Sequence, residues 1–159
     1  LIYAATRPDS FRIERSVVIE APPEKIFPLI NDLRRMQTWS AWENVDPGMK
    51  RTHSGAANGK GAVYAWEGNS EIGAGRMEII ASVPSSLITL RMDFIEPFAA
   101  RNTLEFTLTA ESGTTRVTEA ISGPSPYLSK LMGLVFDMDK MIGGKFDESL
   151  AALKAAAES

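Results

Sequence analysis

The sequence predicts an α+β fold in which one curved antiparallel sheet of about seven strands wraps around a long C-terminal helix. Residues 126–157 carry apolar side chains at every third or fourth position, which places them on one face of an α-helix. Residues 50–122 instead divide into short segments of alternating apolar and polar residues, separated by turns rich in Gly, Pro, Asn and Ser. The apolar face of the helix must be buried, and the sheet is the element available to cover it.

The composition describes one domain with no metal or nucleic-acid signature. A chain of 159 residues is long enough to bury a core without disulfides. The 17 basic and 20 acidic residues give a net charge of −3, whereas nucleic-acid binding requires an excess of Lys and Arg on one face. The chain has no Cys and one histidine, His53, which excludes thiolate and multi-histidine metal sites. We expect neither a metal nor a cofactor.

The N-terminus changes character within a few residues. Residues 1–5 are mostly apolar and residues 6–9 are polar. We expect residues 1–7 to be the remnant of an N-terminal hydrophobic segment, and residues 8–159 to form a single domain. The five apolar residues are far fewer than the roughly 20 that span a bilayer.

The first strand and two short helices are predicted between residues 11 and 36. Residues 11–20 alternate as a strand does. Pro23 and Glu24 then suit the first turn of a helix, because proline is tolerated there and a carboxylate favours the positive end of the helix dipole. Pro28 lies beyond the first turn and should bend or shorten this helix. Asp32 should start a second short helix, so that the two form a V at one end of the sheet.

Six further strands are predicted, at residues 50–54, 62–67, 74–83, 87–94, 101–110 and 115–122. Alternation assigns their apolar residues to one face of the sheet. This inward set comprises Met77, Ile79 and Ala81, then Ile88, Leu90, Met92 and Phe94, then Leu104, Phe106 and Leu108. A sheet with one apolar and one solvated face is covered on one side only.

The long helix contains Gly133, Gly143 and Gly144, each of which costs up to about 1 kcal/mol relative to Ala. A cavity between helix and sheet would explain them. A helix kink or a close approach between helix and sheet is the alternative explanation.

The chain resembles the SRPBCC superfamily, also called START-like, whose members share the helix-grip fold. The resemblance lies in FRIERSVVIEAPPEKIFPLINDLRRMQTWSAWENVDPGMKRT, GAVYAWEGN, GAGRMEI and SGPSPYLSKLMGLVFDMDKMIGGKF, and it covers residues 8–157. The most similar branch is the bacterial polyketide cyclase/dehydrase type. Relatives of this type often carry a hydrophobic segment that ends in an AATRPD-like boundary. The resemblance therefore implies a membrane-anchored parent protein.

Glu119 is the candidate residue for chemistry. Its neighbours Val117 and Ile121, two positions away on either side, are apolar and should face the helix, which directs Glu119 inward as well. A buried carboxyl group must be paired, reach water or bind a proton through a raised pKa. Glu119 is then a polar anchor or a general acid/base. The alternative is a strand-end position near solvent or a substitution without function. The resemblance adds that tryptophan is common at this position.

The residues expected to line a ligand cavity are aromatic side chains, methionines and Glu119. Aromatic rings can form the floor of an apolar pocket, and methionine adapts to irregular spaces. This set comprises Tyr64, Trp66, Met77, Met92, Phe94, Phe106, Glu119, Met132 and Phe136. The resemblance places Trp39 and Trp42 near the cavity mouth. His53 is expected to be a surface residue of its strand.

Three functions remain open from the sequence. The favoured one is binding of a hydrophobic or amphipathic small molecule, such as a lipid, an isoprenoid or a polyketide-like compound. The second is a cyclase or dehydratase in which Glu119, with Tyr64, transfers protons. The third is a protein-interaction domain like a chaperone cofactor. A second titratable group beside a buried Glu119 would favour the enzyme, and a uniformly apolar cavity would favour binding.

Overall fold

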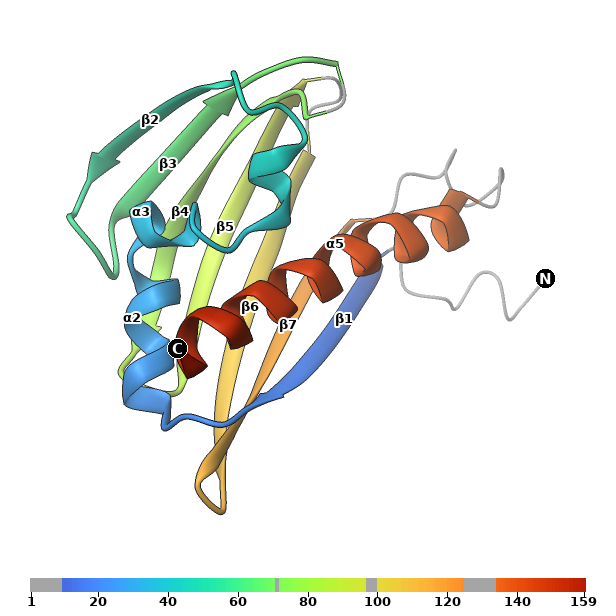
Figure 1. The fold of residues 1–159 in the computed structure, drawn as a ribbon. Coiled ribbons are helices and arrows are strands. Elements are labelled where there is room, and N and C mark those ends of the chain that lie inside the picture. Colours follow the sequence, from blue (N-terminus) through green and yellow to red (C-terminus); the bar gives the residue numbers. More distant parts are fainter. Residues whose placement is uncertain (1–9, 71, 97–99, 125–133) are drawn as a thin grey trace.

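The computed structural model describes residues 10–70, 72–96, 100–124 and 134–159, and they form a sheet crossed by one long helix (Figure 1). The strands are β1 (Ser10–Ile19), β2 (Lys50–Gly55), β3 (Ala62–Glu67), β4 (Ala74–Val83), β5 (Leu87–Glu96), β6 (Ala100–Glu111) and β7 (Thr114–Pro124). The helices are α2 (Pro23–Asn31), α3 (Leu33–Met36), the 3₁₀ helix η1 (Ala41–Asn44) and α5 (Leu134–Glu158).

All seven strands belong to one antiparallel sheet with the order β1-β7-β6-β5-β4-β3-β2. Figure 1 shows α5 crossing the concave face of this sheet, with α2 and α3 at one end. The predicted α+β fold is therefore confirmed, as are the first strand and the two short helices that follow it.

The short helices begin and end where the sequence indicates. Pro23 and Glu24 lie in the first turn of α2, and Pro28 lies inside this helix, which ends three residues later. Asp32 caps α3, because its side chain accepts a hydrogen bond from the backbone N–H of Arg34 at 3.0 Å.

One assignment of the inward face was wrong, because β4 contains a bulge. Ile79 pairs with Leu90, but the next pair joins Ala81 to Thr89, so Ile80 is the extra residue. Residues after the bulge change faces. Ala81 therefore lies on the outer face with Thr89, whereas Ser82 points inward and donates a hydrogen bond to the side chain of Asn31 in α2 at 2.7 Å.

The core lies between the concave face and α5. The inner side of α5 contributes Phe146, Leu150, Leu153 and Ala157, each at most 2% exposed. They belong to one hydrophobic cluster with residues of α2 and of the sheet. Removal of this apolar surface from water is the main force that holds helix and sheet together.

Two adjacent glycines of α5 have different surroundings. A Cβ atom on Gly143 would lie 2.3 Å from Nη2 of Arg15 in β1, whereas a Cβ atom on Gly144 would have no neighbour within 4 Å. Close approach between helix and strand, rather than a cavity, therefore explains Gly143. Gly133 lies outside the described residues.

We expect Gly144→Ala to stabilise the protein by about 0.5–1 kcal/mol, because alanine is the better helix former and meets no obstacle. Gly143→Ala should gain little, since the new methyl group displaces the Arg15 guanidinium from Asp139 and Asp147. The midpoints of urea unfolding measure both effects. An equal gain for the two variants would show that Arg15 does not occupy the space beside Gly143.

Residues 1–9 lie outside the described part of the chain, as does the predicted start of the long helix at residues 126–133. The predicted remnant at residues 1–7 therefore stays a prediction. Among the described helices, none is long and apolar enough to cross a membrane.

Candidate functional site

A cavity of about 260 Å³ lies between the concave face of the sheet, η1 and the middle of α5. Its walls are predominantly apolar. The described residues that line it are Met36, Trp39, Ser40, Trp42, Glu43, Met49, Tyr64, Trp66, Ile72, Met77, Met92, Phe94, Leu104, Phe106, Glu119, Ile121, Met141, Ile142 and Phe146.

The structure brings most of the predicted lining residues together. Tyr64, Trp66, Met77, Met92, Phe94, Phe106 and Glu119 all line this cavity. Trp39 and Trp42 line it as well. Met132 lies outside the described residues, and the side chain of Phe136 is not among those described.

Aromatic rings form much of the wall and contact one another edge-on. The Trp39 ring lies 5.8 Å from Phe106 at an interplanar angle of 89°, and Trp66 lies 6.0 Å from Phe94 at 78°. Both indole N–H groups donate to backbone carbonyls, that of Trp39 to Leu29 at 2.9 Å and that of Trp66 to Ile72 at 3.2 Å. Because their polar groups are satisfied, these rings present apolar surface to the cavity.

Glycine at position 75 leaves room for the Trp66 ring beside β4. A Cβ atom there would lie 2.7 Å from Cζ2 of Trp66 and 2.7 Å from the carbonyl oxygen of Asp93. The backbone of β4 and the indole ring therefore restrict each other's position, and Trp66 in turn defines this end of the cavity.

Glu119 is buried in β7, with 4% of its surface exposed, and lines the cavity. Its Oε1 atom is buried and has no hydrogen-bond partner. Burial raises the pKa of the Glu119 carboxyl well above its ordinary value, because the charged form loses water without gaining a partner. The alternative of a strand-end position near solvent is therefore wrong.

A second polar group in the wall was not predicted. Glu43 of η1 is 9% exposed and accepts hydrogen bonds from the Tyr64 hydroxyl at 2.7 Å and from Nε of Arg51 at 2.8 Å. Burial and the hydrogen bond to Glu43 raise the pKa of the Tyr64 hydroxyl above its ordinary value. The network is satisfied internally, so Tyr64 is a wall residue rather than a free proton donor.

His53 is not the surface residue that we expected. It is half-buried on β2, its ring stacks on Tyr64 with centroids 4.8 Å apart, and its Nε2 contacts the side-chain amide of Gln37. Burial, followed by the positive charge of Arg34, lowers the pKa of His53. His53 is the cross-strand neighbour of Tyr64 and therefore packs beside this wall residue on the same face of the sheet.

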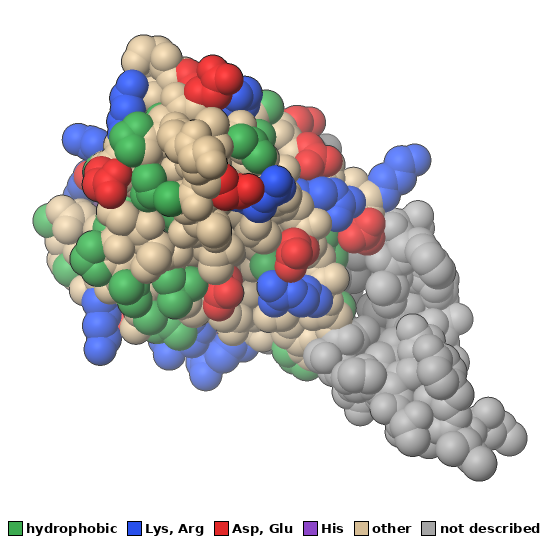
Figure 2. All heavy atoms as spheres, turned by 90° about the horizontal axis from the view of Figure 1, so that it is seen from below, with side chains coloured by type: hydrophobic (Ala, Val, Ile, Leu, Met, Phe, Trp, Pro, Cys, Tyr) green, Lys and Arg blue, Asp and Glu red, His purple; other side chains and the backbone are tan. Residues whose placement is uncertain are grey.

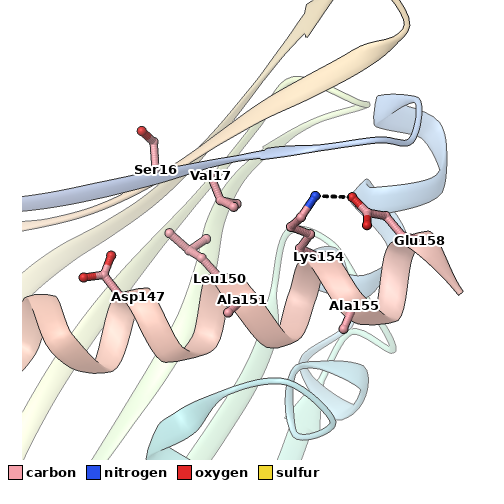
Figure 3. A pocket seen from close by; sticks show the side chains of 8 residues that line it. All are labelled: Ser16, Val17, Asp147, Leu150, Ala151, Lys154, Ala155 and Glu158. Atoms are coloured by element: carbon pink, nitrogen blue, oxygen red, sulfur yellow. Dashed lines mark hydrogen bonds and ion pairs between the residues drawn. The ribbon is translucent and has the colours of Figure 1, made fainter.

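A second hollow, of about 440 Å³, lies at the surface between β1 and α5 (Figure 3). The ammonium group of Lys154 donates to the carbonyl of Val18 at 3.2 Å and pairs with Glu158, which also accepts from the backbone N–H of Glu20 at 2.8 Å. These contacts cover the free edge of β1, which would otherwise expose unpaired backbone groups. The hollow therefore forms where Lys154 and Glu158 cover the edge of β1, and we do not consider it a candidate site.

The described residues contain no cluster of three metal-ligating side chains. On the face shown in Figure 2, acidic and basic side chains are interspersed, and neither sign forms a continuous patch. The apolar cavity between the sheet, η1 and α5 therefore remains the candidate site.

Comparisons with solved structures support the fold. The protein CV1439 from Chromobacterium violaceum aligns with a TM-score of 0.65 and 17% identity over 96% of this chain and 99% of its own. The Aha1 dimer structure from Colwellia psychrerythraea aligns with a TM-score of 0.63 and 18% identity, over 93% of this chain and 96% of its own. StfQ, a di-domain aromatase/cyclase from the steffimycin biosynthetic pathway, aligns with a TM-score of 0.72 and 10% identity, over 98% of this chain and 53% of StfQ. At these identities the likeness concerns the fold alone.

No curated protein sequence matches the chain. A family model described as polyketide cyclase / dehydrase and lipid transport matches residues 10–158, which is nearly the whole chain. The chain therefore belongs to this family, within the SRPBCC superfamily that its sequence resembles.

Proposed function

We propose that the protein binds one hydrophobic or amphipathic small molecule, such as a lipid, an isoprenoid or a polyketide-like compound, in the cavity between the sheet and α5. The observation that carries this proposal is an apolar cavity of about 260 Å³ that contains one unpartnered buried polar atom, Oε1 of Glu119. Ligand pockets commonly combine apolar walls with a few polar groups that fix the orientation of the ligand.

The packing of the surrounding core supports a ligand rather than a packing defect. Protein interiors are close-packed, with few voids larger than a water molecule. Here the side chains around the cavity are held by contacts of their own, such as the hydrogen bonds of Trp39 and Trp66 to backbone carbonyls. Walls that are fixed independently keep the space open for a guest.

A cyclase or dehydratase is the second candidate, and Glu119 is the feature in its favour. Burial raises the pKa of the Glu119 carboxyl and so favours its protonated form, which can act as a general acid. Such an enzyme needs a second group that converges on the substrate. Tyr64 and Glu43 line the same cavity, but they are hydrogen-bonded to each other. Binding therefore has the stronger support.

Binding is tested by filling the cavity from β5. Met92 lines the cavity, so Met92→Trp places an indole where the ligand would lie. We expect this variant to lose binding of an apolar fluorescent naphthalene probe by more than about tenfold, while its stability stays close to wild type because the space already exists. Fluorescence titration measures the affinity, and thermal unfolding measures the stability.

The matched control is Ile95→Trp, which adds the same indole to the same strand at a residue that is 59% exposed. Its probe affinity should equal that of the wild type. If Met92→Trp binds the probe as well as Ile95→Trp, the cavity is not the binding site. If the wild-type protein binds no probe and native mass spectrometry detects no bound small molecule, the protein is instead an interaction domain.

A further inference from the structure

The charge of the cavity is balanced everywhere except at Glu119. Among the described residues that line the cavity, the ionisable carboxyl groups are Glu43 and Glu119, and none is a Lys, Arg or His. Glu43 is paired with Arg51, at 2.8 Å. Glu119 has no cationic partner among the described residues, so an ionised Glu119 would leave one negative charge uncompensated there.

The chain contains a suitable partner for Glu119, but α5 holds it elsewhere. Arg15 of β1 is the direct cross-strand neighbour of Glu119, and direct neighbours in an antiparallel pair lie on the same face. Its Nη2 atom instead lies 3.2 Å from Oδ2 of Asp139, and its Nε atom lies 3.6 Å from Oδ2 of Asp147. The bare backbone of Gly143 leaves room for this orientation. The described residues that line the cavity therefore offer Glu119 no positive charge, and a cationic ligand would supply one.

The walls around Glu119 also favour a cation. The faces of aromatic rings carry partial negative charge and attract ammonium groups, most strongly when water is excluded. In the described part of the chain, seven such rings line the cavity: Trp39, Trp42, Tyr64, Trp66, Phe94, Phe106 and Phe146. Phe106 is the cross-strand neighbour of Glu119, so at least one ring lies directly beside the carboxyl group.

We propose that the preferred ligand is a hydrophobic amine whose protonated nitrogen pairs with the Glu119 carboxylate while its apolar part lies among the aromatic rings. This inference rests on the proposed function and narrows the class of ligand. In the free protein, burial raises the pKa of the Glu119 carboxyl and so favours its protonated form. When the amine binds, that proton passes to solvent and the ammonium takes its place as hydrogen-bond donor, so the cavity remains neutral.

The experiment compares 1-naphthylmethylamine with 1-naphthalenemethanol, which share one two-ring body and differ in the ammonium and hydroxyl groups. Isothermal titration calorimetry on the full 159-residue chain measures both affinities. We expect the amine to bind about tenfold more tightly or better, because its hydrogen bond is charge-assisted. Titrations of the amine in two buffers of different ionisation enthalpy should show the release of about one proton.

Glu119→Gln should remove the preference for the amine, since an uncharged amide cannot form an ion pair with an ammonium group. Glu105→Gln removes the same charge from the outer face of β6 and should keep the preference. If Glu119→Gln fails to fold, proton release by the wild-type protein decides the question.

Each remaining result is decisive. Equal or tighter binding of the alcohol, a preference that survives Glu119→Gln, or amine binding without proton release would overturn the inference and leave the proposed function standing. Absence of binding for both probes would overturn the inference, and the proposed function would fall with it if native mass spectrometry also detects no bound small molecule.

Discussion

Glu119→Gln is expected to make the protein more resistant to unfolding at neutral and alkaline pH, with little gain near pH 4. The reason is that the Glu119 carboxyl is buried and its Oε1 atom has no hydrogen-bond partner. Burial raises the pKa of the group in the folded state, whereas the unfolded chain exposes it with its ordinary pKa.

The sign follows from the protons bound in each state. Below the ordinary pKa of about 4.5, both states hold the proton, and the contribution of Glu119 to stability is fully present. Above it, the unfolded chain releases the proton but the folded protein keeps it. The free energy of unfolding therefore falls by about 1.4 kcal/mol per pH unit until the pH passes the folded pKa. Glutamine does not titrate, so the free energy of unfolding of the variant does not fall with pH for this reason.

The measurement is urea unfolding of both proteins at several pH values between 4 and 8. The difference in the free energy of unfolding should widen in favour of the variant as the pH rises above about 4.5, and it should level off once the pH passes the folded pKa of Glu119. Glu105→Gln controls for net charge, because this glutamate lies half-buried on the outer face of β6. Parallel curves for wild type and Glu119→Gln would show that the carboxyl has a partner or reaches water.

The sheet could be predicted from the sequence because its pattern is local. Side chains alternate between faces of a strand, so segments such as Ala62–Glu67 and Ala74–Val83 could be delimited to the residue. The same rule failed at Ala81, since one extra residue at Ile80 reverses the alternation and nothing in the local sequence marks it.

The candidate site was predicted only in part, because its polar groups depend on contacts distant in sequence. The apolar neighbours Val117 and Ile121 sufficed to direct Glu119 inward. They did not indicate that Glu119 lacks a cationic partner, because this depends on the pairing of Arg15 with Asp139 and Asp147 of α5. Glu43 was missed altogether, since it lies in a short 3₁₀ helix without periodicity.

Glu43→Ala is expected to destabilise the protein by about 3 kcal/mol. Glu43 is buried and Arg51 is 25% exposed, so removal of Glu43 leaves a partly desolvated guanidinium without its carboxylate. Arg51 would lose its hydrogen bond at 2.8 Å, and the Tyr64 hydroxyl would lose its acceptor at 2.7 Å inside the cavity wall. For a protein of this length, the melting temperature should fall by about 6–12 °C.

The matched control is Glu111→Ala, which breaks an ion pair of similar length, 2.9 Å to Arg116, between two exposed side chains. Solvent screens such pairs, so the change in stability should stay within about 0.5 kcal/mol. Equal losses for Glu43→Ala and Glu111→Ala would mean that the Glu43 network is hydrated in solution.

A double-mutant cycle then separates the Tyr64 hydroxyl from the rest of the network. In the wild type, Tyr64→Phe removes a donor and should cost about 1 kcal/mol. In the Glu43→Ala background the same change removes a hydroxyl that has already lost its acceptor, so it should cost nothing or stabilise the protein. A coupling energy of about 1–2 kcal/mol would show that Glu43 and Tyr64 act as one unit of the wall. Additive effects would instead leave the Tyr64 hydroxyl free to contact a ligand, and would strengthen the case for proton transfer in the cavity.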